Sequence, residues 1–459
     1  MIAGIDLGTS AIKIVCTDRD GNVQKARYRY RENTPKEWLL GIREAFSKLE
    51  TEEITAISLS SQVGTYMIDG KVTSWNEAGG EEELEELLGQ FTTEEFVEEI
   101  SMKHPSLTSY PIPRIRYLLK QRESKELPGQ ICQPKEFICR YLTGNTVSDG
   151  YSYRGLVNQR TGRYSSKMLK YMGISEKVLS CIQSPFSEAG RLCEAAAEEC
   201  GLHSGIPVYV GCNDFYASLL GMGITEIGDC FDVTGTSEHV GMITEKLLTD
   251  QRVIASPYIN GNVAYGVTGS SGGSLDFGLR ELKLRDVNYE VYRSKKCLPI
   301  FLPYVNGERA PIYNADARGV FFGIAGDTTK EDMAYAVMEG VAFSTWHIME
   351  NLPHKEIRIV ITAGGAALNE NLLQLKADLF GISFVRVKEE DTSAYGACMI
   401  GAVGEGWYPD VQTAAENMCR QDLTVIPQKN ELLQERFSLY KNIYKDLEKE
   451  FKQFRRINQ

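Results

Sequence analysis

The sequence predicts an α/β protein that folds twice on one plan. Two apolar segments each run into a turn of glycine and hydroxyl residues, the first at residues 4–10 and the second at residues 232–237. Around each turn the chain shows the same succession of strands, a helix and a further strand, which is typical of a mixed sheet covered by helices. No shorter period appears, so this is a two-fold duplication and not a solenoid. We expect two domains, residues 1–224 and 225–459.

The elements of the first half follow from local patterns. Apolar, β-branched runs bounded by turn residues predict strands. Thr34 and Glu37 have the spacing of a capping box, and Pro35 suits the first turn of a helix. The expected elements are strands at 2–6, 11–17 and 23–30, a helix at 34–49, a strand at 54–60, helical segments at 114–119 and 135–142, a strand at 207–211 and a helix at 215–222. Residues 80–201 are expected to be mostly helical.

The second half repeats this order. Its expected elements are strands at 230–234, 238–244 and 263–267, a helix at 330–350 and a strand at 357–363. Residues 430–451 form an amphipathic helix, which we expect to pack against the rest of the protein.

Composition excludes several classes of protein. The 459 residues carry 50 Lys and Arg against 62 Asp and Glu, a net charge of −12. This balance disfavours a nucleic-acid partner, which would need clustered cations. Neither a signal peptide nor an apolar run long enough to span a bilayer is found, so we expect a cytoplasmic protein without a membrane partner. The eleven scattered cysteines predict reduced thiols.

The two turns have the chemistry of a phosphate-binding site. Glycine lets backbone N–H groups approach phosphate oxygens, and Thr and Ser hydroxyls donate further hydrogen bonds. Each turn taken alone is equally typical of an ordinary hairpin. The residues concerned are Gly8, Thr9, Ser10 and Lys13 in the first segment, and Thr234, Gly235, Thr236 and Ser237 in the second. Asp6 precedes the first turn, where its carboxylate can hold a hydrated magnesium ion.

Two further segments add to this pattern. Asp214 lies where an apolar strand meets a helix, so its carboxylate is either a general base or an ordinary N-cap. Gly364 and Gly365 end a strand, where a flat adenine ring could lie on bare backbone and Asn369 could reach its edge.

Residues 301–311, 319–343 and 362–369, taken with these segments, resemble the FGGY family of carbohydrate kinases. The resemblance runs from Met1 to about Trp407. It implies two actin-like (ribonuclease H-like) ATPase domains, each a mixed five-stranded sheet flanked by helices, with the active site in the cleft between them. It also implies ATP and Mg²⁺ as cofactors.

Site residues are carried over from this resemblance one by one. Asp214 matches the family's catalytic base, and Asp6 the aspartate that helps to hold Mg-ATP, so both are expected at the metal. The two hydroxyl-rich turns and Lys13 match the phosphate segments, and Gly364, Gly365 and Asn369 the adenosine segment. Residues 391–397 resemble the family's second connecting segment.

The sugar end departs from the pattern. Gln62, Trp75 and Asn76 match substrate-binding positions, but Val63-Gly64 stands where xylulokinases have Met-His. The arginine expected three residues after Asn76 is Gly79. Further differences are Arg114 and Tyr117 in place of a lysine and a tryptophan, Phe215-Tyr216 where glycerol kinases have two glutamines, and the unusual pair Glu238-His239.

The resemblance therefore implies an ATP-dependent kinase for a small sugar, with a ketopentose such as xylulose expected and another polyol, an aldonate or a ketohexose as alternatives. From a different class, an actin-like ATPase and a catalytically silent sugar-binding relative remain open. The expected partners are the sugar or polyol and ATP, with a homodimer as one expectation for the assembly.

Overall fold

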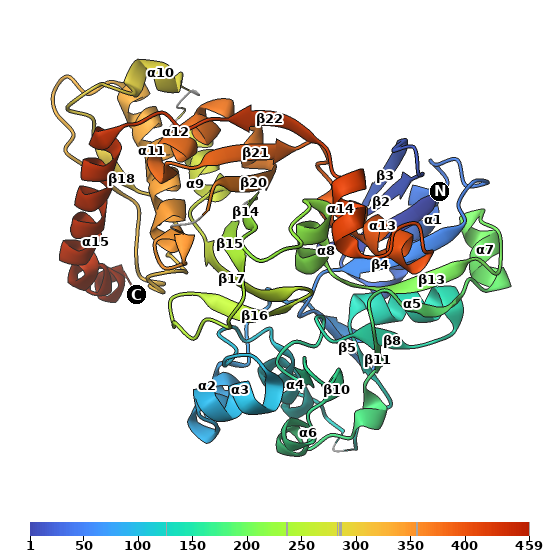
Figure 1. Ribbon diagram of the computed structural model, residues 1–459. Coiled ribbons are helices and arrows are strands. Elements are labelled where there is room, and N and C mark those ends of the chain that lie inside the picture. The colour runs from blue at the N-terminus through green and yellow to red at the C-terminus, as the bar shows by residue number, and fades with distance from the viewer. Residues whose placement is uncertain (125, 236, 282, 284–286, 355–356, 459) are drawn as a thin grey trace. The chain divides into compact units, whose positions relative to one another are not determined.

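The computed structural model describes residues 1–458, apart from residues 125, 236, 282, 284–286 and 355–356 (Figure 1). The chain forms two compact units, each assembled from separate stretches. The first consists of Met1–Thr225, Ser256–Ile259 and Asp391–Cys419, and the second of Glu226–Ala255, Asn260–Glu390 and Arg420–Gln459. The first unit thus includes a segment from late in the sequence. The domain boundary after residue 224 stays a prediction.

A six-stranded mixed sheet is the centre of the first unit. Its strands are β1 (Ile2–Leu7), β2 (Ala11–Thr17), β3 (Val23–Arg29), β4 (Ala56–Ser61), β12 (Glu188–Arg191) and β13 (Pro207–Asn213). They lie in the order β12-β13-β4-β1-β2-β3. The first three strands of the chain pair antiparallel, whereas β1, β4 and β13 run parallel. Apart from β12, which was not expected, the expected and observed strands agree to within a few residues.

Helices cover both faces of this sheet (Figure 1). The helices are α1 (Pro35–Phe46), α5 (Pro134–Thr143), α7 (Glu194–Cys200), α8 (Asp214–Gly221), α13 (Thr392–Gly404) and α14 (Val411–Met418). One core joins α1, α5 and α7 to sheet residues such as Ile5. A second joins α13 and α14 to Ile2, Val15 and Ala56 on the opposite face. The late segment therefore completes the α/β/α sandwich of the first unit.

The rest of the first unit is less helical than the sequence suggested. Its elements are β5 (Tyr66–Ile68), β6 (Lys71–Thr73), α2 (Glu81–Gln90), α3 (Thr93–Ile100), α4 (Pro111–Lys120), β7 (Ile131–Cys132), β8 (Val147–Asp149), β9 (Val157–Asn158), β10 (Arg163–Tyr164), α6 (Ser166–Met172) and β11 (Cys181–Gln183). Short pairs of strands lie between the helices. One example is β9 and β10, which pair antiparallel across a local turn. A separate core with Tyr66, Phe96 and Tyr153 holds this region together.

The second unit repeats the plan of the first with a seven-stranded sheet. Its strands are β14 (Cys230–Thr234), β15 (Glu238–Thr244), β16 (Ile254–Tyr258), β17 (Gly261–Thr268), β20 (Ile359–Gly364), β21 (Ser383–Val387) and β22 (Gln421–Val425). The order is β16-β17-β15-β14-β20-β21-β22. As in the first unit, three antiparallel strands are followed by two parallel ones.

The shared arrangement confirms two α/β domains with mixed sheets but corrects the expected number of strands. The five strands common to both units are β3-β2-β1-β4-β13 and β17-β15-β14-β20-β21. Beyond them, β12 is added to the first sheet and β16 and β22 to the second. These outer strands pair with edges whose N–H and C=O groups would otherwise lack partners.

Long helices complete the second unit. Its other elements are α9 (Gly272–Arg280), α10 (Tyr289–Tyr292), β18 (Ile300–Leu302), β19 (Val320–Phe322), α11 (Lys330–Met349), α12 (Glu370–Phe380) and α15 (Glu431–Asn458). α15 buries Leu433, Phe437 and Tyr440, which confirms the expected packing helix. Glu339 of α11 is fully buried and accepts hydrogen bonds of 2.7 and 2.5 Å from the guanidinium of Arg436 in α15.

Two remaining expectations concern cysteines and membranes. All eleven cysteines are free and most are buried, as expected. Among the described residues, no helix is both long and apolar enough to cross a bilayer.

The contact between α8 and α13 generates a test of the fold. A side-chain carbon added at Gly396 of α13 would lie 1.8 Å from the carbonyl oxygen of Ala217 in α8. Because backbone cannot move aside as a side chain can, we expect Gly396→Ala to lower the free energy of unfolding by about 1–3 kcal/mol.

Gly89 in α2 is the matched control, since no described atom lies within 4 Å of a carbon added there. Gly89→Ala should leave stability unchanged or raise it by up to about 1 kcal/mol. Urea unfolding followed by circular dichroism measures both variants. Equal stability of the two would contradict the close helix contact.

Candidate functional site

Asp6 is a buried carboxylate near the end of the central strand β1. The hydroxyl of Ser60 donates to its Oδ1 at 3.3 Å, and that of Ser393 to its Oδ2 at 2.6 Å. Burial raises the pKa of Asp6, and the hydrogen bond from Ser393 and the charge of Lys13 offset part of this rise. Directly after β1, the N–H of Gly8 donates to the carbonyl of Ala11 at 3.0 Å and closes the expected tight turn.

The start of α13 lies beside this turn. Lys13 Nζ and Asp391 Oδ1 form an ion pair of 2.8 Å, and Ser393 is the residue that reaches Asp6. Residues 391–393 therefore belong with the first phosphate turn, although they come late in the sequence. In this arrangement the ammonium of Lys13 is directed to a protein carboxylate, and its expected phosphate contact stays a prediction.

Asp214 is the first residue of α8, and the side chain of Asn213 caps the helix by accepting from the N–H of Tyr216 at 3.0 Å. The interpretation of Asp214 as an ordinary N-cap is therefore wrong. Burial, reinforced by the charge of Asp6, raises the pKa of Asp214 to about 7. The N–H of Phe215, which donates at 2.8 Å, and the charge of Arg154 oppose that rise.

These two carboxylates suit a magnesium ion. The charge of Asp6 raises the pKa of Asp214, as expected for two carboxyl groups that lie near one another. Among the described residues, no group of three or more His, Cys, Asp and Glu side chains gathers to hold a metal alone. Magnesium is commonly bound by one or two carboxylates together with water and substrate phosphates, so the donor set fits.

Trp75 and Gln62 are tied to the same turn. Trp75 Nε1 donates to the hydroxyl of Thr9 at 2.9 Å, and its backbone N–H donates to Thr65 at 3.1 Å. Gln62 is buried, donates to the carbonyl of Gly8 at 3.2 Å and accepts from Thr65 at 3.1 Å. Asn76 lies exposed beside Trp75. Gln62 thus positions the turn, and its expected sugar contact stays a prediction.

The departures at Gly79, Arg114 and Tyr117 all concern the loop that carries Trp75. Gly79 has φ +114°, and an added side-chain carbon would lie 2.3 Å from Cζ of Tyr117. The ring of Tyr117 therefore fills the space that an arginine side chain would enter. Arg114 is fully buried, and its Nη2 donates to the carbonyls of Glu77 at 2.8 Å and of Trp75 at 3.4 Å. It holds the loop that carries Trp75.

In the second unit, Thr234 joins the second turn to the double-glycine segment. Its hydroxyl donates to the carbonyl of Ala363 at 3.0 Å and accepts from the N–H of Ala367 at 3.0 Å. A side-chain carbon at Gly364 would lie 1.8 Å from the carbonyl oxygen of Thr234, so only glycine allows this approach.

The other expected nucleotide residues of the second unit lie around this contact. Gly235 donates its N–H to the carbonyl of Ser237 at 2.9 Å, and Gly365 begins the short helical turn after β20. Asn369 caps α12 by accepting from the N–H of Leu372 at 3.0 Å. Thr236 lies outside the described residues.

A buried charge network beneath the second turn was missed by the sequence analysis. Lys376 of α12 lies 2.8 Å from Asp232 Oδ2 and 2.7 Å from Glu238 Oε1, and all three side chains are fully buried. Glu238 also accepts hydrogen bonds of 2.5 Å from both Ser271 and Thr345. The unusual Glu238 is therefore the partner of Lys376. The available signal was that Lys376 lies between the apolar residues Leu375 and Ala377.

Charge balance in this network is uneven. Burial, followed by the charge of Glu238, raises the pKa of Asp232 to about 8. Burial also opposes ionisation of Glu238, but Lys376 and the two hydroxyls outweigh it and lower the pKa of Glu238. One lysine is thus balanced chiefly by one ionised carboxylate.

Glu308, in the segment 307–311 that supports the resemblance, anchors a loop. It is buried and accepts hydrogen bonds from the hydroxyls of Thr268 at 2.8 Å and Ser344 at 3.0 Å. It also accepts from the N–H of Gly269 at 2.8 Å. The segment therefore fixes the end of β17 against α11.

Both halves of the chain match one protein family. The family model for the N-terminal domain of the FGGY family of carbohydrate kinases matches residues 1–221, and that for the C-terminal domain matches residues 232–405. The chain belongs to the FGGY family of carbohydrate kinases. The protein is therefore a sugar kinase, which is a phosphotransferase. This membership excludes the alternative that the chain is an actin-like ATPase of another functional class.

Individual relatives agree with this assignment. A xylulose kinase from Staphylococcus xylosus is 27% identical, and the match covers 96% of this chain and 99% of the relative. A glycerol kinase from Aquifex aeolicus is 25% identical over 97% of each chain. Among solved structures, a gluconate kinase and a ligand-bound xylulose kinase, both from Lactobacillus acidophilus, each give a TM-score of 0.87 at 23% identity over 99% of both chains. These structures confirm the FGGY kinase fold.

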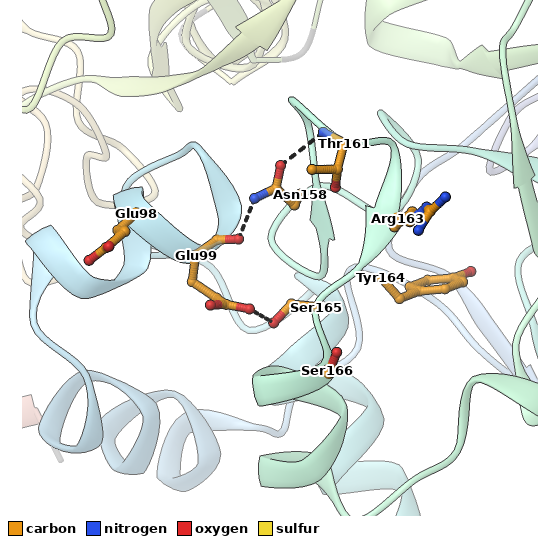
Figure 2. Close-up of a pocket in the computed structure, with 8 residues that line it drawn as sticks. All are labelled: Glu98, Glu99, Asn158, Thr161, Arg163, Tyr164, Ser165 and Ser166. Atoms are coloured by element: carbon orange, nitrogen blue, oxygen red, sulfur yellow. Dashed lines mark hydrogen bonds between the residues drawn. The ribbon is translucent and has the colours of Figure 1, made fainter.

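The sugar kinase also has a polar hollow of about 470 Å³ away from the expected site (Figure 2). Its lining residues are Glu98, Glu99, Asn158, Thr161, Arg163, Tyr164, Ser165 and Ser166. They hydrogen-bond one another: Asn158 Nδ2 donates to the carbonyl of Glu99 at 2.7 Å, and its Oδ1 accepts from the N–H of Thr161 at 3.0 Å. The hollow contains none of the expected site residues.

The lysine network gives a second test. Lys376→Met would leave Glu238 and Asp232 buried without their cation, and we expect the free energy of unfolding to fall by about 3–5 kcal/mol. The measurement is denaturant unfolding at neutral pH.

Lys429 supplies the matched control, because its ion pair with Glu431 is 84% and 77% exposed at the two side chains. Lys429→Met should change stability by no more than about 0.5 kcal/mol. If Lys376→Met lowered the free energy of unfolding as little as Lys429→Met, the buried ion pairs of Lys376 would not stabilise the fold.

Proposed function

We propose that the protein transfers the γ-phosphoryl group of ATP to a hydroxyl of a small sugar, a ketopentose such as xylulose. The observation that carries this proposal is Asp214, a carboxylate at the first position of α8 with its pKa raised to about 7. A general base works best when its pKa lies near the working pH. Relatives named xylulose kinase, which match along nearly their whole length, support the choice of sugar.

Each expected residue then has a role in the first unit. Asp214 accepts the proton of the attacking sugar hydroxyl, while Asp6 and Asp214 would hold magnesium. Gly8, Thr9, Ser10 and Lys13 would bind phosphate. When bound, magnesium neutralises charge on the phosphates.

The second unit would supply the rest of the nucleotide site. Its expected residues are Thr234, Gly235, Thr236, Ser237, Gly364, Gly365 and Asn369. Thr234 supports this role indirectly, because it holds the phosphate turn against the double glycine. Phosphoryl transfer depends mainly on positioning and charge neutralisation, so such fixed turns suit it.

Trp75, Asn76 and Gln62 define the proposed sugar side. Trp75 is 38% exposed although its indole N–H is held by Thr9, so its ring has a fixed orientation and one accessible surface. An aromatic ring of this kind can cover the apolar face of a sugar. Aldonates, ketohexoses and other polyols remain the alternatives for the same site.

A coupled assay of ADP release over pentuloses, hexuloses, aldonates, polyols and glycerol tests the proposal. We expect a pentulose such as D-xylulose to give the highest kcat/KM with Mg-ATP. Preference for an aldonate or a hexulose would change the proposed acceptor but would still support the proposed phosphoryl transfer. The absence of ATP consumption with every acceptor would instead support a silent sugar-binding relative.

Asp214→Asn tests the base. Because the amide cannot take up a proton, we expect kcat to fall by about 10²- to 10⁴-fold, with nucleotide affinity by calorimetry nearly unchanged. Asp410, an exposed aspartate that caps α14, offers the control. Asp410→Asn keeps a good cap and should keep wild-type turnover. Comparable turnover in both variants would remove Asp214 as the base.

A further inference from the structure

Arg154 places a buried guanidinium beside the proposed base. Its guanidinium carbon lies 5.1 Å from the centre of the Tyr110 ring and 5.9 Å from that of Tyr216. Tyr216 is two residues beyond Asp214 on α8, and a hydrogen bond joins its side chain to Arg154. The side chain of Arg154 is close enough for its charge to act on Asp214. A cation thus lies near the proposed base and in contact with the helix that carries it.

A buried ion pair between Lys135 and Asp149 fixes the loop that carries Arg154. Asp149 Oδ1 accepts from the N–H groups of Tyr151 at 2.8 Å and Ser152 at 3.0 Å. Asp149 Oδ2 lies 3.1 Å from Lys135 Nζ, and both side chains are fully buried. The N–H of Arg154 in turn donates to the carbonyl of Tyr151 at 3.4 Å. Such support holds the guanidinium in one position, as a binding residue requires.

Contacts within the first unit connect Arg154 to the sugar side. Tyr110, which contacts Arg154, follows Ser109, and a side-chain carbon at Gly64 would lie 2.9 Å from Ser109 and 3.3 Å from Cβ of Trp75. Trp75 is bonded to Thr9 in the first phosphate turn. A chain of contacts within the first unit therefore links Arg154 to Trp75 and to the first phosphate turn.

The loop around Gly79 lacks the arginine that the family resemblance leads one to expect there. Arg114, the arginine nearest to this loop, is directed to the backbone carbonyls of Glu77 and Trp75. The ring of Tyr117 fills the space in front of Gly79. Arg154, which contacts the ring of Tyr110, is an arginine on another element of the first unit that could supply a donor fork for the acceptor.

We propose that Arg154 binds the acceptor sugar and determines specificity by donating its planar pair of N–H groups to neighbouring hydroxyls. This inference rests on the proposed sugar kinase reaction. A guanidinium carries five donors in a fixed plane, which suits two adjacent oxygens better than an ammonium does. Val63, Gly64 and Gly79, which break the family pattern, are compensated by this residue.

The test uses Arg154→Gln and Arg154→Lys in the full-length protein, with whichever sugar the wild-type protein phosphorylates best. We expect Arg154→Gln to raise KM for the sugar by about 10- to 100-fold, while KM for ATP changes less than about twofold. Arg154→Lys, which keeps the charge but loses the fork, should give an intermediate KM. A uniform fall in kcat without a change in KM for the sugar would overturn the proposal.

Arg116 is the matched control. Its guanidinium lies 4.1 Å from the centre of the Tyr171 ring and pairs with Glu86 at 2.6 Å, so it makes the same kind of contact elsewhere in the first unit. Arg116→Gln should leave KM for the sugar within about twofold of wild type. If KM for the sugar rose equally in Arg154→Gln and Arg116→Gln, the effect would be due to lost packing and not to lost sugar binding.

Sugars lacking one hydroxyl separate binding from a structural role. For the hydroxyls that Arg154 contacts, removal should lower kcat/KM in the wild-type protein but not further in Arg154→Gln or Arg154→Lys. Equal losses in wild type and variants for every deoxy sugar would overturn the proposal. If wild type phosphorylates no sugar, the proposed function fails instead, before any variant is compared.

Discussion

Burial of an aspartate on the central strand of each sheet is the constraint around which both units are organised. Asp232 and Glu238 share the ammonium of Lys376, so the second unit contains its own cation. Asp6 is compensated by the hydroxyls of Ser60 and Ser393 and by the charge of Lys13. One duplicated plan thus yields one aspartate that has a buried lysine as its partner and one that has hydroxyl groups and a partly exposed lysine nearby.

The sequence revealed the parts of this arrangement that are local. The turns at Gly8 and Gly235 and the helix after Asp214 follow from residue types within a few positions. Lys376 and Ser393 could not be found in this way, because their partners lie more than a hundred residues away in the chain. The outer strands β12, β16 and β22 were missed for a related reason: a short edge strand is defined by the neighbour that pairs with it.

The sugar side changed as a set of coupled positions. Gly64 has φ +83° and packs against Ser109, so the histidine of xylulokinases would meet that residue. Tyr117 and Gly79 fit one another, and Arg114 holds the loop of Trp75 from behind. Each difference looked like a lost ligand when taken alone. Together they show that several neighbouring side chains differ from the family pattern at once, whereas Asp214 matches it.

The late segment Asp391–Cys419 has a consequence for the order in which the protein can assemble. Ile2, Val15 and Ala56 emerge from the ribosome early, yet the helix that covers them, α13, is made near the end of synthesis. This face of the first sheet stays uncovered while the chain up to Glu390, which includes most of the second unit, is translated. The nascent chain therefore carries an uncovered apolar surface for most of its synthesis. During this period the exposed face of the sheet could bind a chaperone.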